Sequence, residues 1–211
     1  MTLSTWKLLG FDARENELAG RNTPIPPKIR EVMLLRPEIE SPYSVDRHIW
    51  PTQFLYFPHT RTYTRVPPLI ETDKESEYDF WPNLTQMQRS LAENGRQAIL
   101  IAVQMLAPEN ITFSKYVPPN IHLKTDPKSI PDGSICLGFD VADSGFWSGL
   151  SNCGYSEEER KRLRPEWQSK INDFGLLQTE QDALIFREMT DIRVPEHAPF
   201  WVYKLYRLQE S

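Results

Sequence analysis

The stretch "WPNLTQMQRSLAENGRQAILIAVQML" (residues 81–106) decides the fold class, because it holds the two clearest secondary-structure signals in the chain. In its first half, apolar residues recur at helical spacing behind a polar residue suited to cap a helix, namely Leu84, Met87 and Leu91 after Asn83. Gly95 stands where such a helix would end. The run "AILIAVQML" that follows is continuously apolar between polar turns, which is typical of a buried central strand.

Further strands are expected on both sides of this pair of elements. The run "STWKLLGF" (4–11) alternates with period two, and "ENITFSKYV" (109–117), "ICLGFDV" (135–141) and "APFWVYKLYRL" (198–208) are also typical of strands. Strands and helices that do not alternate as regular βαβ units predict an α+β fold, in which one mixed, mainly antiparallel sheet packs with a few helices. The stretches "LLGFDAREN" and "CLGFDVADS" echo each other, and both predict a strand that ends in an aspartate-bearing turn.

Two helices or more are expected between the last two strands. The stretch "SEEERKRL" opens with a capping box, formed by Ser156 and Glu159. Pro165 is expected to begin a second helical segment, since proline is favoured at the first helical position. The stretch "TEQDALIFREMTDI" then predicts a further helix, capped by Thr179.

The length of 211 residues predicts a single domain, residues 1–211, with an irregular segment at about 36–82. Seven prolines punctuate short aromatic runs in that segment, and such frequent prolines restrict it to edge strands or ordered loops. Its aromatic residues either complete the core or form an exposed surface for a protein partner, and we favour the core.

Composition and charge limit the classes of function. Hydrophobic residues make up 39% of the chain and charged residues 25%, and no apolar run is long enough to span a membrane. The first residues do not resemble a signal peptide and the chain has only two cysteines, Cys136 and Cys153, so we expect a cytoplasmic protein with reduced thiols. A net charge of −5 without a basic block argues against direct nucleic acid binding, and it is compatible with a basic protein partner.

Cys153 is the candidate nucleophile for an enzymatic alternative. It lies just before an expected helix N-terminus, where the helix dipole activates a thiol, and His197 is the candidate base. Asn152 or Asp191 would orient that histidine. No cysteine-protease signature surrounds Cys153, so the competing interpretation is a small residue in a glycine-bounded turn.

Oxygen ligands for a hard cation are available in principle from Asp140 and Asp143, together with Glu157 or Glu196. Their spacing does not match an EF-hand loop, and aspartates that follow a strand commonly cap turns, so we expect them to do so here. The four histidines are dispersed, and no zinc, phosphate-binding or serine-hydrolase motif is present. We therefore expect no metal, no cofactor and no catalytic site.

The stretch "GFDVADSGFWSGLSNCGYS" (138–156), a charged helix after it and "VPEHAPFWVYKLYRL" (194–208) together resemble one family. They are similar to immunity proteins of bacterial polymorphic-toxin and contact-dependent growth inhibition systems, over about the C-terminal third of the chain. The resemblance implies a non-enzymatic inhibitor that binds one cognate toxin domain, in many cases a basic nuclease, and it carries over no site residues. Two alternatives stay open: a Cys153-dependent hydrolase or transferase, and a structural or regulatory subunit without a toxin partner.

Overall fold

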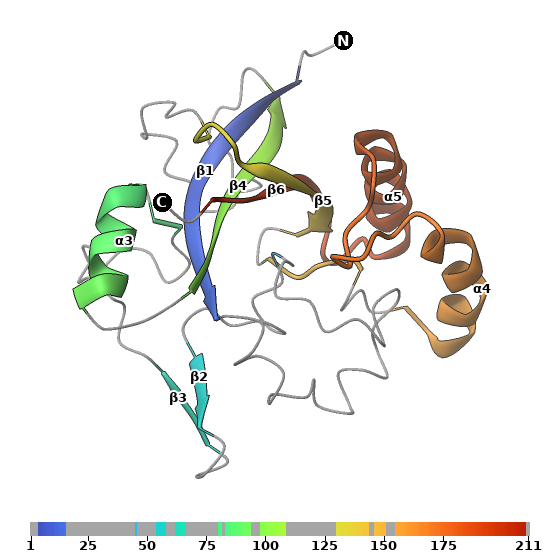
Figure 1. The fold of residues 1–211 in the computed structure, drawn as a ribbon. Coiled ribbons are helices and arrows are strands. Elements are labelled where there is room, and N and C mark those ends of the chain that lie inside the picture. Colours follow the sequence, from blue (N-terminus) through green and yellow to red (C-terminus); the bar gives the residue numbers. More distant parts are fainter. Residues whose placement is uncertain are drawn as a thin grey trace.

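The computed structural model describes residues 4–15, 45, 54–57, 62–65, 80–81, 83–93, 98–108, 130–143, 146–150 and 155–209. Its main element is a four-stranded antiparallel sheet in the order β1-β4-β6-β5 (Figure 1), built from β1 (Ser4–Glu15), β4 (Ala98–Pro108), β6 (Trp201–Arg207) and β5 (Ile135–Ala142). The described helices are α3 (Leu84–Glu93), α4 (Glu157–Gln168) and α5 (Glu180–Arg193). The expected α+β class is confirmed. None of the described helices is long and apolar enough to cross a membrane.

The proline-rich segment at about 36–82 contributes two described strands, β2 (Phe54–Phe57) and β3 (Thr62–Arg65). They pair with each other in an antiparallel two-stranded sheet, so each is an edge strand, as predicted for this segment. Phe80 and Val45 of the same segment are buried in the core. Trp81 of this segment is half-buried and packs against the core cluster below α3. The roles of the segment's other aromatic side chains are not described, and the expected strand 109–117 and Gly95 lie outside the described residues.

Both edge strands of the main sheet contain a bulge at a glycine. The pairing register shifts between Leu8 and Gly10 in β1 and between Cys136 and Gly138 in β5. The two glycines have φ values of +148° and +135°. A Cβ atom at either position would lie within 2.7 Å of a backbone carbonyl oxygen, so only glycine allows this close approach.

The residue after each of these glycines hydrogen-bonds to the segment that leads into a helix. Phe11 exchanges two backbone hydrogen bonds of 2.9 and 2.8 Å with Trp81, and Phe139 exchanges two of the same lengths with Leu177. Two residues after each of these partners comes the N-cap of a helix. The echo between the two "GFD" stretches therefore has a structural counterpart. The expectation that each stretch ends in an aspartate-bearing turn was wrong for the first stretch, because β1 continues past Asp12 to Glu15. It was correct for the second stretch, because β5 ends at Ala142 and Asp143 follows in a turn.

The pairing register reveals an internal repeat, in which β1–α3–β4 corresponds to β5–α4–α5–β6. Val103 pairs with Gly10, and Leu205 pairs with Gly138. Val103 and Leu205 also pair directly with each other. A local two-fold axis thus passes through this central pair, and it places α3 and α5 at opposite ends of the sheet (Figure 1).

The two faces of the sheet pack against different parts of the chain. On one face, which we call the helix face, Met87 and Leu91 of α3 pack against β1 and β4, and Ala183 and Phe186 of α5 pack against β5 and β6. The opposite face is a continuous apolar core that includes Ile101, Val103, Met105, Tyr203 and Leu205 of the central strands, together with Val45, Phe80, Phe146 and Leu176. Burial of this much apolar surface is the main favourable term in folding.

The predicted N-caps of the three described helices are confirmed. Backbone N–H groups of α3 donate to the side chain of Asn83, Thr179 caps α5, and the capping box of Ser156 is complete at α4. The prediction for Pro165 was wrong, because this residue lies inside α4 and begins no second helix. The side chains of Leu163 and Trp167, on either side of the proline, are buried. Their packing stabilises the helix although Pro165 has no backbone N–H to donate.

Candidate functional site

The first candidate is the polar turn after β5, which is organised by the fully buried carboxylate of Asp140. Its Oδ1 accepts hydrogen bonds from the N–H of Val141 (2.9 Å) and the hydroxyl of Ser148 (2.6 Å). Its Oδ2 accepts from the N–H of Val45 (3.0 Å), a residue 95 positions away. The carboxylate is thus an acceptor for three protein donors. Asp140 lies inside β5 and also holds a distant part of the chain at Val45, so its role is wider than the turn capping predicted for it.

Asp143 binds the two aromatic residues that cover the end of this turn. Its Oδ1 accepts from the N–H of Trp147 (2.9 Å), and its Oδ2 lies 2.8 Å from Nδ1 of His197. The ring of Trp147 stacks on the imidazole of His197 with 5.5 Å between centroids. The His197 side chain is 35% exposed and that of Asp143 only 9%, so a buried carboxylate holds a histidine that solvent can reach.

Asp191, one of the two residues expected to orient His197, does not do so. The carboxylate of Asp191 accepts from the N–H of Phe200 at 2.7 Å, and the orienting role belongs to Asp143. Burial raises the pKa of the Asp191 carboxyl, and the hydrogen bond from Phe200 only partly opposes this effect. Cys153 and Asn152 lie outside the described residues, so the nucleophile remains a prediction.

The acidic residues considered as cation ligands are not brought together. Glu157 forms an exposed ion pair with Lys161 (2.6 Å) on α4, and Glu196 is exposed on the loop before β6. Within the described parts of the chain, no group of three His, Cys, Asp or Glu side chains is placed to hold a metal ion.

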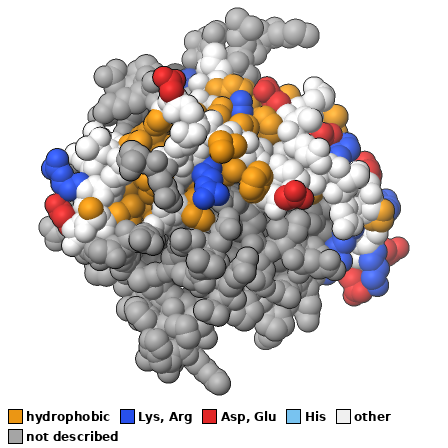
Figure 2. Space-filling view, in the orientation of Figure 1, with side chains coloured by type: hydrophobic (Ala, Val, Ile, Leu, Met, Phe, Trp, Pro, Cys, Tyr) orange, Lys and Arg blue, Asp and Glu red, His pale blue; other side chains and the backbone are white. Residues whose placement is uncertain are grey.

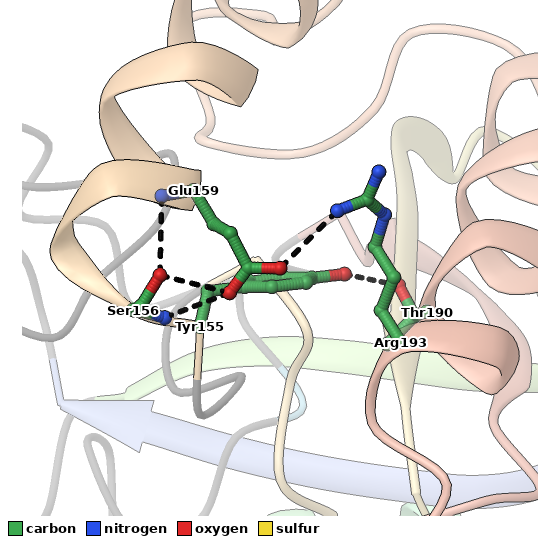
Figure 3. A network of polar contacts seen from close by, with 5 residues as sticks. All are labelled: Tyr155, Ser156, Glu159, Thr190 and Arg193. Atoms are coloured by element: carbon green, nitrogen blue, oxygen red, sulfur yellow. Dashed lines mark hydrogen bonds and ion pairs between the residues drawn. The ribbon is translucent and has the colours of Figure 1, made fainter.

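Polar contacts at the start of α4 link this helix to α5 (Figure 3). The carboxylate of Glu159 accepts from the backbone N–H of Ser156 (3.1 Å) and pairs with the guanidinium of Arg193 (3.3 Å). The hydroxyl of Tyr155 lies 3.4 Å from that of Thr190. The hydrogen bonds from the backbone and side chain of Ser156 lower the pKa of Glu159, and Arg193 adds to this effect. These groups therefore stabilise the packing of two helices.

The second candidate is a strip of half-buried residues on the helix face, between the ends covered by α3 and α5. We call it the central strip, and it consists of Trp6, Leu8, Gln104, Leu106, Lys204 and Tyr206. The register places Trp6 beside Leu106, and Leu8 beside Gln104, which in turn lies beside Lys204. Figure 2 shows hydrophobic side chains gathered over the strands in this region, with basic side chains among them.

Lys204 lies at the centre of this strip among three aromatic rings. Its Nζ is 5.6 Å from the ring centroid of Trp6, 5.7 Å from that of Phe139 and 5.3 Å from that of Tyr206. These distances allow cation–π attraction. Burial lowers the pKa of Lys204, but its interactions with the side chains of Tyr206, Cys136 and Glu180 outweigh burial, so the pKa lies above its ordinary value. The ammonium group is therefore charged at neutral pH.

The central strip was not predicted from the sequence. The run "VYKLY" indicated a strand, and in a strand Val202, Lys204 and Tyr206 lie on one face. Nothing local in the sequence indicated that β1, with Trp6, would complete the surroundings of this lysine. Comparison with protein-family models, with curated protein sequences and with solved structures found no match.

Proposed function

We propose that this chain is a cytoplasmic immunity protein, which binds and neutralises a cognate toxin domain by protein–protein contact. The observation that carries the proposal is the central strip. Aromatic side chains on a rigid element are favoured anchors at protein interfaces, and Trp6 and Tyr206 occupy such positions on adjoining parts of one sheet.

The partner that we propose is a basic nuclease domain. The chain carries 29 acidic and 24 basic residues, and its net charge of −5 would attract a basic partner at long range. The polar turn after β5 supports a non-enzymatic role, because Asp140 and Ser148 are used in hydrogen bonds that hold the turn together.

Affinity capture followed by a growth assay tests this proposal. The tagged chain is captured from cells that encode it, at low and at high salt, and a stoichiometric basic partner is then expressed alone and together with the chain. We expect the partner to stop growth when expressed alone and growth to recover on co-expression. A partner that is harmless by itself, or toxicity that the chain does not relieve, would contradict the proposal.

A matched pair of variants locates the contact. Trp6→Ala removes an aromatic anchor from the central strip and should weaken protection. Ile192→Ala removes an apolar side chain that is 80% exposed on α5, outside the strip, and should leave protection unchanged. Equal protection by both variants would show that the toxin contacts another surface.

A Cys153-dependent hydrolase or transferase is the second candidate, and the contact between His197 and Asp143 favours it. A histidine whose Nδ1 is held by a carboxylate presents its other ring nitrogen as a base, which is the arrangement used to activate a nucleophile. Labelling with iodoacetamide tests this candidate. A pH-dependent rapid reaction at Cys153 that slows in His197→Gln would support it, and a rate equal to that of free cysteine would exclude it.

A further inference from the structure

The ammonium group of Lys204 forms no salt bridge with a carboxylate of the described part of the chain. Its hydrogen-bonding neighbour there is the side chain of Tyr206, and the charge of Glu180 acts on it only from a longer distance. Salt bridges hold several other basic side chains, and Lys170, which also lies over a tryptophan ring, pairs with Asp182 at 3.0 Å. No carboxylate among the described residues lies within 4.0 Å of Lys204. A half-buried charge with aromatic rings around it gains from a negative partner more than a fully hydrated one does, because water screens the attraction less.

Gln104 supplies a second donor beside this ammonium group. It is the direct cross-strand partner of Lys204, and such neighbours have Cβ atoms about 5 Å apart. Its Oε1 accepts the hydroxyl hydrogen bond of Tyr206 at 3.2 Å, which fixes the orientation of the amide. The NH₂ group donates to none of the described residues, so two adjacent donors face the space above the sheet. Two adjacent donors match the two oxygens of one carboxylate.

Apolar side chains lie around these two donors. Leu8 lies next to Gln104, and Leu106 and Trp6 form the neighbouring row, so a ligand group that lies beside the carboxylate would contact hydrocarbon and an aromatic ring. A cation would be repelled by Lys204, and a purely apolar ligand would desolvate its ammonium group without supplying a negative charge, which is costly.

We propose that the central strip binds a protein segment in which one aspartate or glutamate is flanked by apolar residues, with Lys204 and Gln104 receiving the carboxylate. This inference rests on the proposed function only in that the segment would belong to the toxin domain. An overall basic toxin with a locally acidic contact segment would be attracted by net charge and then selected by the strip, since local charge complementarity sets register and specificity.

Peptide selection tests the inference without knowledge of the toxin. A displayed library of random peptides is selected against the full chain, against Lys204→Glu and against Lys204→Met. Lys170→Met serves as the matched control, because it removes another lysine that lies over a tryptophan ring but outside the strip. We expect the unaltered chain and Lys170→Met to enrich peptides with an acidic residue between apolar ones. Lys204→Glu should lose these peptides and enrich basic ones.

The best peptide is then synthesised with its acidic residue and with the corresponding amide. The amide should bind the unaltered chain about tenfold more weakly, as expected for the loss of one charge-assisted contact of about 1.4 kcal/mol, while Lys204→Met should bind both peptides equally. Gln104→Leu removes the second donor and should independently lower the affinity of the chain for the acidic peptide. Thermal unfolding of every variant verifies that the fold is retained, since Lys204 and Gln104 are only half-buried.

Failure of this inference is distinguishable from failure of the proposed function. Selection of no peptide, of peptides without acidic residues, or of acidic peptides that bind Lys204→Met equally well overturns the inference, even if the chain protects cells from a toxin. Acidic peptides that depend on Lys204, in a chain for which no toxic partner exists, would uphold the surface and reject the immunity role.

Discussion

Replacing Gly138 with alanine tests whether the bulge in β5 determines how closely the edge strand approaches the segment before α5. Gly138 has a φ of +135°, and a Cβ atom there would lie 2.7 Å from the carbonyl oxygen of Leu177 and 2.8 Å from the amide nitrogen of Asn172. The position is buried, and the first of these neighbours is backbone that cannot turn away. The alanine therefore meets both an unfavourable backbone conformation and a steric overlap.

The expected loss of stability combines these two effects. A left-handed backbone conformation costs an L-residue about 1–2 kcal/mol. Forcing an extra methyl group into a packed site costs about 1–3 kcal/mol more. A total near 3 kcal/mol corresponds to a fall in Tm of about 6–12 °C for a chain of this length.

Thermal and urea unfolding followed by circular dichroism measure this loss, with Gly133→Ala as the control. Gly133 also has a positive φ, of +81°, but it is exposed in the turn before β5, and its Cβ would meet only the end of the flexible Gln209 side chain. The control should lose only the backbone contribution, about 1–2 kcal/mol. Gly10→Ala should match Gly138→Ala, because the internal repeat gives both glycines the same role. Equal losses in Gly138→Ala and Gly133→Ala would refute the steric argument.

Three further changes test the scaffold. Asp140→Asn should lower stability by about 1–3 kcal/mol, because an amide nitrogen in place of Oδ2 cannot accept the N–H of Val45; urea unfolding measures this. Ser156→Ala should cost about 1 kcal/mol and leave protection from the toxin unchanged, and lost protection at unchanged stability would show that the cap also serves binding. Burial raises the pKa of Asp191, so the folded chain keeps this proton to higher pH than the unfolded chain, and stability falls as pH rises through that window. Asp191→Asn, which keeps an acceptor for Phe200, should therefore gain Tm relative to the unaltered chain as pH rises above the ordinary pKa of an aspartate, and a Tm difference that stays constant with pH would refute the sign.

Local signals in the sequence predicted the secondary structure where a few neighbouring residues decide it. The caps Asn83, Ser156 and Thr179 and the apolar run of β4 were all identified correctly. Pro165 was misplaced because the helix around it depends on the burial of Leu163 and Trp167, which local preference does not report.

The candidate sites were harder to predict from the sequence. The contact between Asp143 and His197 joins residues 54 positions apart. Asp191 is nearer to His197 in the sequence, but its carboxylate accepts the N–H of Phe200. The echo of the "GFD" stretches was visible in the sequence, yet its meaning required the pairing of each edge strand with the segment before a helix.

The sequence alone thus determined the types of element, their caps and the α+β class, because hydrogen bonds within a turn of helix and the alternation of a strand involve residues close in the chain. Only the tertiary structure decided the strand order, the repeat about the Val103 and Leu205 pair, and the half-buried position of Lys204 among aromatic rings. These features depend on contacts between β1, β4 and β6. The three strands are far apart in the sequence, so no local sequence pattern indicates these contacts. The surface proposed to bind a partner belongs to this second group, since no single strand contains it.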